Sequence, residues 1–400
     1  MLQGQSIICF AHDWAGDPTS KTHIMRILSA KNKILWVNSI AMRRPSASGR
    51  DLRRLLAKLK RGLEGSTRVD ENFYVCNPLV LPLPGVPGVD AFNTAILSCF
   101  LRHLMHRHGF QRPILWTFLP NVNRLVGRLG ERLVIYHCVD EYTAFSGVPR
   151  RTLQRMERDL LGKADLVFTS SEQLCRERRV HNPSTFFVSH GVDMPHFSRA
   201  LEADTPIPSD IQTIPRPVIG FFGLIAEWID LPLVRALALA RPDWSIVLVG
   251  KATTDLGPVT GLPNVHLLGQ RPYGTLPGYC KAFDVGIIPF RVNELTLKAN
   301  PLKLREYLAA GLPVVSTDLP EVRKYASLVR LATDPDTFLR GVEACLGEDR
   351  AVLASQRANS MRGESWESRV EEICGHIRNA APHRKSPATN LAPCGSVPTR

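Results

Sequence analysis

The sequence predicts an α/β protein made of two successive domains, each with a parallel β-sheet covered by helices. Short apolar runs alternate with longer amphipathic stretches along most of the 400 residues. This alternation is typical of a parallel sheet with helices on both faces. A proline-rich stretch at residues 205–217 interrupts the pattern, and the alternation then starts again. A chain of this length has enough residues for two cores of ordinary size.

The first domain is expected to span residues 1–204 and the second residues 205–360. The strands predicted for the first domain are residues 6–11, 33–38, 114–118, 133–137 and 166–170, with helices such as 20–30 and 150–162 between them. The strands predicted for the second domain are residues 218–222, 245–250, 265–268, 285–289 and 314–316. A final helix is expected near residues 367–378, within a segment at 361–379. Residues 380–400 are rich in Pro, Ser and Thr and are expected to be disordered.

The composition indicates a globular protein of a reducing compartment. Hydrophobic residues make up 44% of the chain and charged residues 22%, as in ordinary folded domains. The nine cysteines are scattered singly without a C-x-x-C pair, so neither a disulfide framework nor a structural zinc site is expected. The apolar run at residues 92–101 is too short to span a bilayer. His12 and Asp13 break the apolar start that a signal peptide needs. We therefore predict a cytoplasmic protein.

The formal charge of +13 calls for an anionic partner. Residues 49–63 combine a stripe of five leucines with six basic side chains, and residues 97–112 are a second basic, partly apolar segment. Both patterns favour contact with an anionic membrane surface. The alternative is that the leucines pack on the domain core while the charges are solvated. Nucleic acid is not expected as a partner, because no recognised binding module supports it.

The most informative segment is residues 300–317, NPLKLREYLAAGLPVVST. Pro301 suits the first position of a helix, whose free N–H groups can bind a phosphate. Lys303 would add a positive charge near that end. Glu306 lies three residues after Lys303, so the two side chains share a helix face and can pair. The alternative interpretation is an ordinary exposed salt bridge.

Glu306-Tyr-Leu-Ala-Ala-Gly-Leu-Pro-Val-Val resembles the donor-site signature of retaining GT-B glycosyltransferases of family 4, also called group 1. Together with His12-Asp-Trp-Ala-Gly-Asp-Pro-Thr-Ser-Lys21, it is similar to enzymes of teichuronic acid and exopolysaccharide biosynthesis. The resemblance extends over roughly residues 8–372. It implies two facing Rossmann-like domains, the first on the acceptor side and the second binding the nucleotide-sugar, with a C-terminal helix that crosses back to the first.

The resemblance also implies an activity. It is the metal-independent transfer of a sugar, with retention, from a UDP- or GDP-sugar to a lipid-linked or other glycan acceptor. The enzyme would need no cofactor. The basic segments at residues 49–63 and 97–112 add the expectation that it is peripheral on the inner face of the cell membrane. Two alternatives remain open, a nucleotide-sugar epimerase of the same architecture and a non-catalytic scaffold of a polysaccharide assembly complex.

Several site residues follow from the resemblance. A carboxylate at the position of Glu306 would hold the ribose hydroxyls of the donor. The family's earlier glutamate is replaced by Lys298, which could instead hold a diphosphate or the carboxylate of an acidic sugar. His137, at the end of a buried strand, would contact the donor sugar beside the reaction centre. Asp140 would lie next to it on the acceptor side.

The segment at residues 12–21 is a loop that follows the first predicted strand. Loops at the carboxyl ends of parallel strands are where such sheets bind ligands. Gly16 would let the backbone approach a ligand closely, and Ser20 could cap the next helix. By resemblance this loop lies near the donor phosphates and the acceptor, through residues His12, Gly16, Asp17, Ser20 and Lys21. The alternative is a capped helix start above a buried Trp14.

A third loop follows residues 218–222 at Gly223, and it lacks the basic residue that family members often carry there. The diphosphate charge must then be met by other residues, and the candidates are Lys303, Arg271, Lys298 and Lys251. We favour Lys303 first and Arg271 second. Asp334-Pro-Asp336 looks superficially like a metal-binding D-x-D motif, but helix capping explains it better. No metal site is expected.

Overall fold

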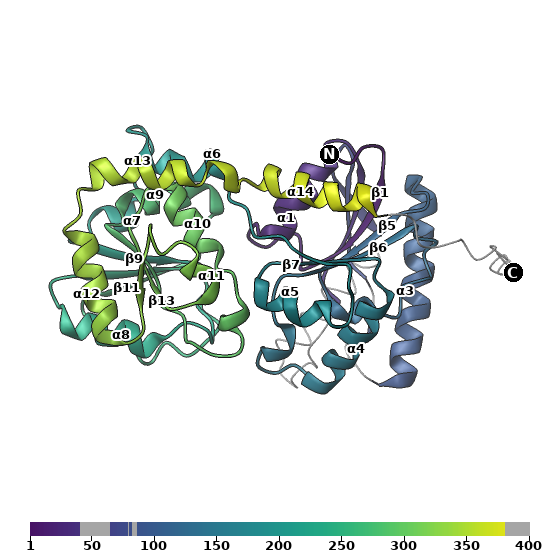
Figure 1. The fold of residues 1–400 in the computed structure, drawn as a ribbon, viewed down its shortest axis with the longest axis horizontal. Coiled ribbons are helices and arrows are strands. Elements are labelled where there is room, and N and C mark those ends of the chain that lie inside the picture. Colours follow the sequence, from purple (N-terminus) through teal and green to yellow (C-terminus); the bar gives the residue numbers. More distant parts are fainter. Residues whose placement is uncertain (41–64, 79, 82–85, 381–400) are drawn as a thin grey trace, which may run out of the picture.

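The computed structural model describes residues 1–40, 65–78, 80–81 and 86–380 of the chain. The described residues form two α/β lobes that stand side by side (Figure 1), which we call the N lobe and the C lobe. Each lobe has its own sheet with helices on both faces, and the two-domain α/β architecture expected from the sequence is confirmed. The basic segment at residues 49–63 and the tail at residues 381–400 lie outside the described residues.

The sheet of the N lobe has the strand order β3-β4-β2-β1-β5-β6-β7-β8. Strands β3 and β4 pair antiparallel at one edge, and the remaining neighbours are parallel. The strands are β1 (Ser6–Phe10), β2 (Lys33–Val37), β3 (Ser66–Asp70), β4 (Phe73–Cys76), β5 (Ile114–Thr117), β6 (Leu133–Cys138), β7 (Leu166–Thr169) and β8 (Thr185–Phe187). The helices are α1 (Ser20–Ser29), α3 (Pro87–His108), α4 (Arg150–Lys163) and α5 (Glu172–Arg179), with the short turns η1 (Pro120–Val122) and η2 (Tyr142–Ala144).

The sheet of the C lobe is entirely parallel, in the order β11-β10-β9-β12-β13-β14. Its strands are β9 (Val218–Phe222), β10 (Ser245–Val249), β11 (Val265–Gly269), β12 (Val285–Ile288), β13 (Val314–Thr317) and β14 (Arg330–Ala332). The helices are α8 (Leu231–Ala240), α9 (Leu276–Ala282), α10 (Leu302–Ala309), α11 (Pro320–Arg323), α12 (Pro335–Leu346) and α13 (Arg350–Ser360), with turns η4 (Tyr273–Thr275) and η5 (Thr296–Lys298). In both lobes the strand order reverses beside the first strand, so each sheet has a crevice at the carboxyl ends of its strands.

The chain crosses between the lobes twice, and the two crossings touch. After β8 it enters the C lobe, and Val192 already belongs to the C-lobe core. It returns through η6 (Arg362–Glu364) and α14 (Trp366–Asn379), and Trp366 packs in the N-lobe core. The yellow end of the chain shows this return in Figure 1. A Cβ on Gly191 would lie 2.7 Å from the Trp366 amide nitrogen, so glycine permits the close approach of the crossings.

The first crossing comes earlier than the predicted domain boundary at residue 205. The segment α6 (Met194–Phe197), η3 (Ser198–Leu201) and α7 (Ser209–Gln212) packs on the C lobe, because Phe197, Ala200 and Ile211 join its core. The proline-rich stretch at 205–217 therefore lies on the C-lobe surface and is not the connection between lobes. The C-terminal helix that crosses back to the N lobe is present as α14.

The ten predicted strands are all present, with ends that shift by at most two residues. Pro301 differs slightly from expectation. It is the N-cap of α10, because its ψ of 117° is extended, and the helix starts at Leu302. Among the helices of the described part of the chain, none is long and apolar enough to cross a membrane.

Candidate functional site

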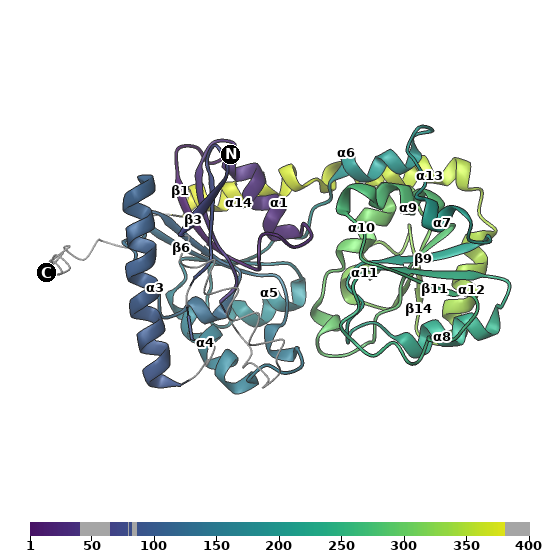
Figure 2. The same ribbon diagram turned by 180° about the vertical axis from the view of Figure 1, so that it is seen from behind.

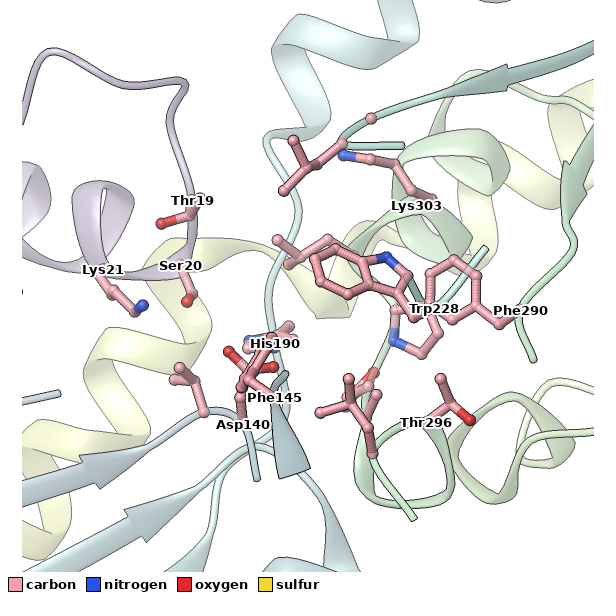
Figure 3. A pocket seen from close by; sticks show the side chains of 18 of the residues that line it. Thr19, Ser20, Lys21, Asp140, Phe145, His190, Trp228, Phe290, Thr296 and Lys303 are labelled. Atoms are coloured by element: carbon pink, nitrogen blue, oxygen red, sulfur yellow. The ribbon is translucent and has the colours of Figure 1, made fainter. Parts of the chain in front are cut away.

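A cavity of about 250 Å³ lies between the two lobes, lined by residues of both. Its walls come mainly from the loops or helix starts that follow β1, β6, β8, β9 and β12. These are carboxyl ends of parallel strands in both sheets, where ligands bind in this architecture. Figure 3 shows Thr19, Ser20 and Lys21 on one side of the cavity and Lys303, Trp228 and Phe290 on the other.

The N-terminus of α10 forms part of the C-lobe wall. Leu302 and Lys303 line the cavity, and the first N–H groups of a helix have no partner within the helix. The ammonium group of Lys303 lies 2.9 Å from Oε2 of Glu306 and 4.7 Å from the centre of the Phe222 ring. The helix dipole and the Lys303 charge act in the same direction, so this wall favours an anion.

Gly223 is required beside Lys303. Its φ of 138° is in a region that favours glycine, and an added Cβ would lie 2.8 Å from Cε of Lys303. Glu306 is 9% exposed and does not line the cavity itself. The predicted pair of Lys303 and Glu306 is therefore present, but in the wall of a cavity and not on an open surface. Through it, the Glu306 carboxylate orients the Lys303 ammonium group.

Lys21 and Asp140 form the charged part of the N-lobe wall. Lys21 is in the first turn of α1 and Asp140 follows β6, and both line the cavity together with Ser20. Burial lowers the pKa of Lys21, and Asp140 opposes that shift. Burial likewise raises the pKa of Asp140, and Lys21 opposes that shift. Each group therefore stabilises the charged form of the other.

The histidine expected to contact the donor sugar, His137, does not line the cavity. His137 is 2% exposed and packs against Phe118 with ring centres 4.9 Å apart, beneath the cavity wall and not among its lining residues. Burial and the nearby Lys21 lower its pKa to about 3, so it is neutral at pH 7. His190 lines the cavity instead. The His190-Gly-Val-Asp stretch after β8 was the sequence signal for it. Burial also lowers the pKa of His12, to about 4, and its ring packs on Trp36.

Much of the remaining wall is apolar, and sequence reasoning did not assign it. Its side chains are Phe145, Leu224, Trp228, Phe290 and Leu295. Phe145 comes from the N lobe and Trp228 from the C lobe, and their ring centres lie 6.0 Å apart at an interplanar angle of 83°. The signal was the sequence Glu227-Trp228, which stands where a basic residue was expected.

Three of the four basic candidates for the diphosphate do not line this cavity. Lys298 pairs with Glu141 and Glu177, each at 3.0 Å. Arg271 is 2.7 Å from Asp210, and its Nε donates to the Tyr279 hydroxyl oxygen at 3.0 Å. Lys251 is exposed after β10. Lys303 alone among the four reaches the cavity.

The loop after β1 is divided in the same way. Ser20 and Lys21 line the cavity, whereas His12, Gly16 and Asp17 do not. Asp17 has a role between the lobes, because its Oδ2 accepts a hydrogen bond from Nε2 of Gln270 at 2.9 Å.

Asp334 caps α12 through a hydrogen bond from the Thr337 amide at 2.8 Å. In the parts of the chain that the structure describes, no group of His, Cys, Asp and Glu could hold a metal ion.

Residues 216–348 match the family model described as Glycosyl transferases group 1. The C lobe therefore carries a group 1 glycosyltransferase domain. TuaH of Bacillus subtilis, named as a teichuronic acid biosynthesis glycosyltransferase, is 29% identical over 290 residues, which cover 66% of this chain and 71% of TuaH. LpsB of Rhizobium meliloti, a lipopolysaccharide core biosynthesis mannosyltransferase, is 25% identical over 57% of this chain and 68% of its own length.

Solved structures share the GT-B fold across almost the whole chain. Sucrose-phosphate synthase of Thermosynechococcus elongatus superposes with a TM-score of 0.66 at 16% identity, over 94% of this chain and 98% of the other. HepE of Anabaena, in complex with UDP-glucose, superposes with a TM-score of 0.64 at 14% identity, over 93% of this chain and 99% of the other. At these identities the likeness establishes the fold alone.

Proposed function

We propose that this glycosyltransferase moves a sugar, with retention, from a nucleoside diphosphate to a lipid-linked glycan acceptor in polysaccharide biosynthesis. The observation that carries the proposal is the cavity where the N-terminus of α10 and Lys303 face Lys21 and Asp140 across the two lobes. Relatives named for teichuronic acid and lipopolysaccharide biosynthesis support the pathway class. A related fold bound to UDP-glucose supports the donor class.

In this proposal the diphosphate binds at the N-terminus of α10. Its negative charge meets the free N–H groups of the helix and the Lys303 ammonium group, both already oriented before the reaction. Glu306, behind the cavity wall, holds Lys303 in place through the 2.9 Å ion pair. The C1–O bond to the phosphate breaks as negative charge develops on the leaving diphosphate, and this charge is what the C-lobe wall stabilises.

The acceptor approaches from the N lobe. Asp140 accepts a hydrogen bond from the attacking hydroxyl, and Lys21 favours the ionised form of Asp140 against the effect of burial. The acceptor oxygen forms its bond to C1 on the face from which the phosphate leaves, and the leaving phosphate takes the proton. His137 and His190 support this wall as neutral rings. Two lobes that close over the donor exclude water and limit hydrolysis.

A donor panel tests the proposal. UDP- and GDP-sugars are offered to the protein with membrane lipid extract as the acceptor, and released nucleotide and product stereochemistry are measured. We expect one donor to yield free UDP or GDP and an extended lipid with the anomeric configuration of the donor. An isomeric nucleotide-sugar formed from donor alone would identify an epimerase, and an inverted product would contradict retention.

We also propose that the protein works at the anionic inner face of the cell membrane, docked by the outer face of α3. This helix forms the edge of the N lobe farthest from the C lobe (Figures 1 and 2). Phe92 is 53% exposed and Ile96 40% exposed. The rest of the exposed face is uncharged up to Cys99, and the basic side chains Arg102 and Arg107 follow. Such a face suits an acidic interface.

Replacing Phe92 and Ile96 together with serine is expected to reduce binding to acidic vesicles at least about tenfold, because each side chain loses roughly 1.5–3 kcal/mol of apolar burial. Flotation with phosphatidylglycerol-containing and neutral liposomes measures the change. Val352→Ser is the matched control, because Val352 is 66% exposed on α13 of the C lobe. If the double variant floats as well as the control, α3 is not the docking face.

A further inference from the structure

The cavity is lined by charged and by aromatic side chains, and the aromatic ones have no assigned ligand. Lys303 and the N-terminus of α10 belong to its C-lobe wall. Trp228, Phe145 and Phe290 are among its aromatic lining residues. In Figure 3 the indole ring of Trp228 lies beside Lys303, and Phe290 is next to it. A sugar bonded to a phosphate at Lys303 would therefore have the Trp228 ring as a neighbour.

We propose that Trp228 and Phe145 form a stacking platform for the donor sugar, and that the platform selects an uncharged pyranose. This inference rests on the donor site proposed above. A pyranose ring has a face of C–H groups, and a broad aromatic ring offers such a face both apolar contact and the negative side of its π-system. Packing of the sugar against the exposed side of this pair of rings then orients its anomeric carbon toward the diphosphate.

The platform is assembled from both lobes. Phe145 follows η2 in the N lobe and Trp228 follows β9 in the C lobe. Next to the rings, the Ser146 amide donates a hydrogen bond to Oε1 of Glu227 at 2.9 Å. This bond fixes the two loops that carry the rings, so the edge-to-face arrangement depends on the lobes being together. The sugar is therefore enclosed only when the lobes have closed.

The charges of the cavity favour an uncharged sugar. Among the lysines and arginines of the described residues, Lys303 and Lys21 line the cavity. Lys298, which the sequence offered as a partner for an acidic sugar, is held by Glu141 and Glu177. With Lys303 engaged by the diphosphate, only Lys21 of these two is left for a sugar carboxylate, and the Asp140 carboxylate on the same wall repels such a group.

Calorimetric titration of wild type and Trp228→Ala with UDP, UDP-glucose, UDP-glucuronate, GDP and GDP-mannose tests the platform. We expect Trp228→Ala to bind the free nucleoside diphosphate within twofold of wild type. The added affinity that the uncharged sugar gives over the free diphosphate should fall roughly five- to tenfold. Wild type should prefer UDP-glucose to UDP-glucuronate if uridine is the base. Trp228→Phe, which keeps a ring, should retain most of the added affinity.

Several outcomes would overturn the platform. One is an unchanged ratio of nucleotide-sugar to nucleotide affinity in Trp228→Ala, and another is a preference for UDP-glucuronate. A third is an equal loss for sugar-bearing and free nucleotides, which would mean that Trp228 supports the nucleotide. If wild type binds none of the five probes, the donor site itself is wrong, which is a different failure from that of the platform. Phe145→Leu provides a second variant should Trp228→Ala not fold.

Discussion

Replacing Lys303 with alanine is expected to weaken binding of a nucleoside diphosphate roughly 10- to 100-fold. The side chain is 22% exposed and its ammonium group is held at the cavity by Glu306, 2.9 Å away. A charge-assisted hydrogen bond contributes about 1.5–3 kcal/mol, which corresponds to that loss. The helix N–H groups remain in the variant, so binding should be weakened but not abolished. Titration calorimetry with UDP and GDP measures the effect.

Lys251→Ala is the informative comparison for Lys303→Ala. Both substitutions remove one positive charge from the C lobe, but Lys251 is exposed and does not line the cavity. We expect the affinity for UDP and GDP to change less than threefold in Lys251→Ala, because salt screens an exposed, solvated charge. A larger loss for Lys251→Ala than for Lys303→Ala would mean that the diphosphate binds elsewhere on the C lobe. Thermal melting of both variants checks that neither loss reflects unfolding.

The sheet strands could be predicted because burial on both faces leaves a strong pattern. All six residues of β6 are buried, and the run Leu-Val-Ile-Tyr-His-Cys shows it. Three of the four strands that were not predicted lack that pattern. β3 is largely exposed and reads Ser-Thr-Arg-Val-Asp, while β8 and β14 have only three residues each. The fourth, β4, reads Phe-Tyr-Val-Cys, is mostly buried and has the same length as β5, so its pattern was present and was missed.

A site residue could be predicted from the sequence only where the order of strands and helices places it at the cavity. Gly223 directly follows β9 and Lys303 is in the first turn of α10, which follows β12, so the topology brings both to the carboxyl edge of the same sheet. The side chains of Lys298 and Arg271 are instead held by partners far along the chain, Glu141 and Asp210. Whether a basic residue faces a ligand or an internal carboxylate depends on such contacts between distant segments. For the same reason, Phe145 and Trp228 could not be paired from the sequence.

A buried ion cluster in the N lobe is the second place where a large effect is expected. Arg178 of α5 is 5% exposed and its guanidinium group lies 3.0 Å from Glu141, 3.1 Å from Glu157 and 2.8 Å from Glu177. Glu141 also binds Lys298 of the C lobe at 3.0 Å. The cluster therefore holds a buried carboxylate that contributes both to the N-lobe core and to the contact between the lobes.

Arg178→Met is expected to lower the free energy of unfolding at pH 7 by about 3–5 kcal/mol, because it leaves buried carboxylates without their main partner. Arg176→Met is the matched control. Arg176 lies on the same helix, but it is exposed and its one ion pair, with Glu172, is long at 3.7 Å. Its replacement is therefore expected to change the free energy of unfolding by no more than about 0.5 kcal/mol. Urea denaturation of both variants measures the difference. Equal stability of the two variants would contradict a structural role for the cluster.

The effect of Arg178→Met should also depend on pH. Burial raises the pKa of Glu141, but Arg178, Thr143 and Lys298 outweigh that effect and bring it from 4.5 to about 2. A depressed pKa of this kind stabilises the wild type above pH 4.5, and the stabilisation is lost as the pH falls from 4.5 toward 2. Without Arg178, the pKa of Glu141 rises, because only Thr143 and Lys298 then oppose the effect of burial, and protonation relieves part of the lost pairing. The difference in the free energy of unfolding between wild type and Arg178→Met should therefore be largest above pH 4.5 and should become smaller below it. A difference that stays constant from pH 7 to pH 3 would show that the lost packing of the arginine side chain, and not its charge, sets the stability.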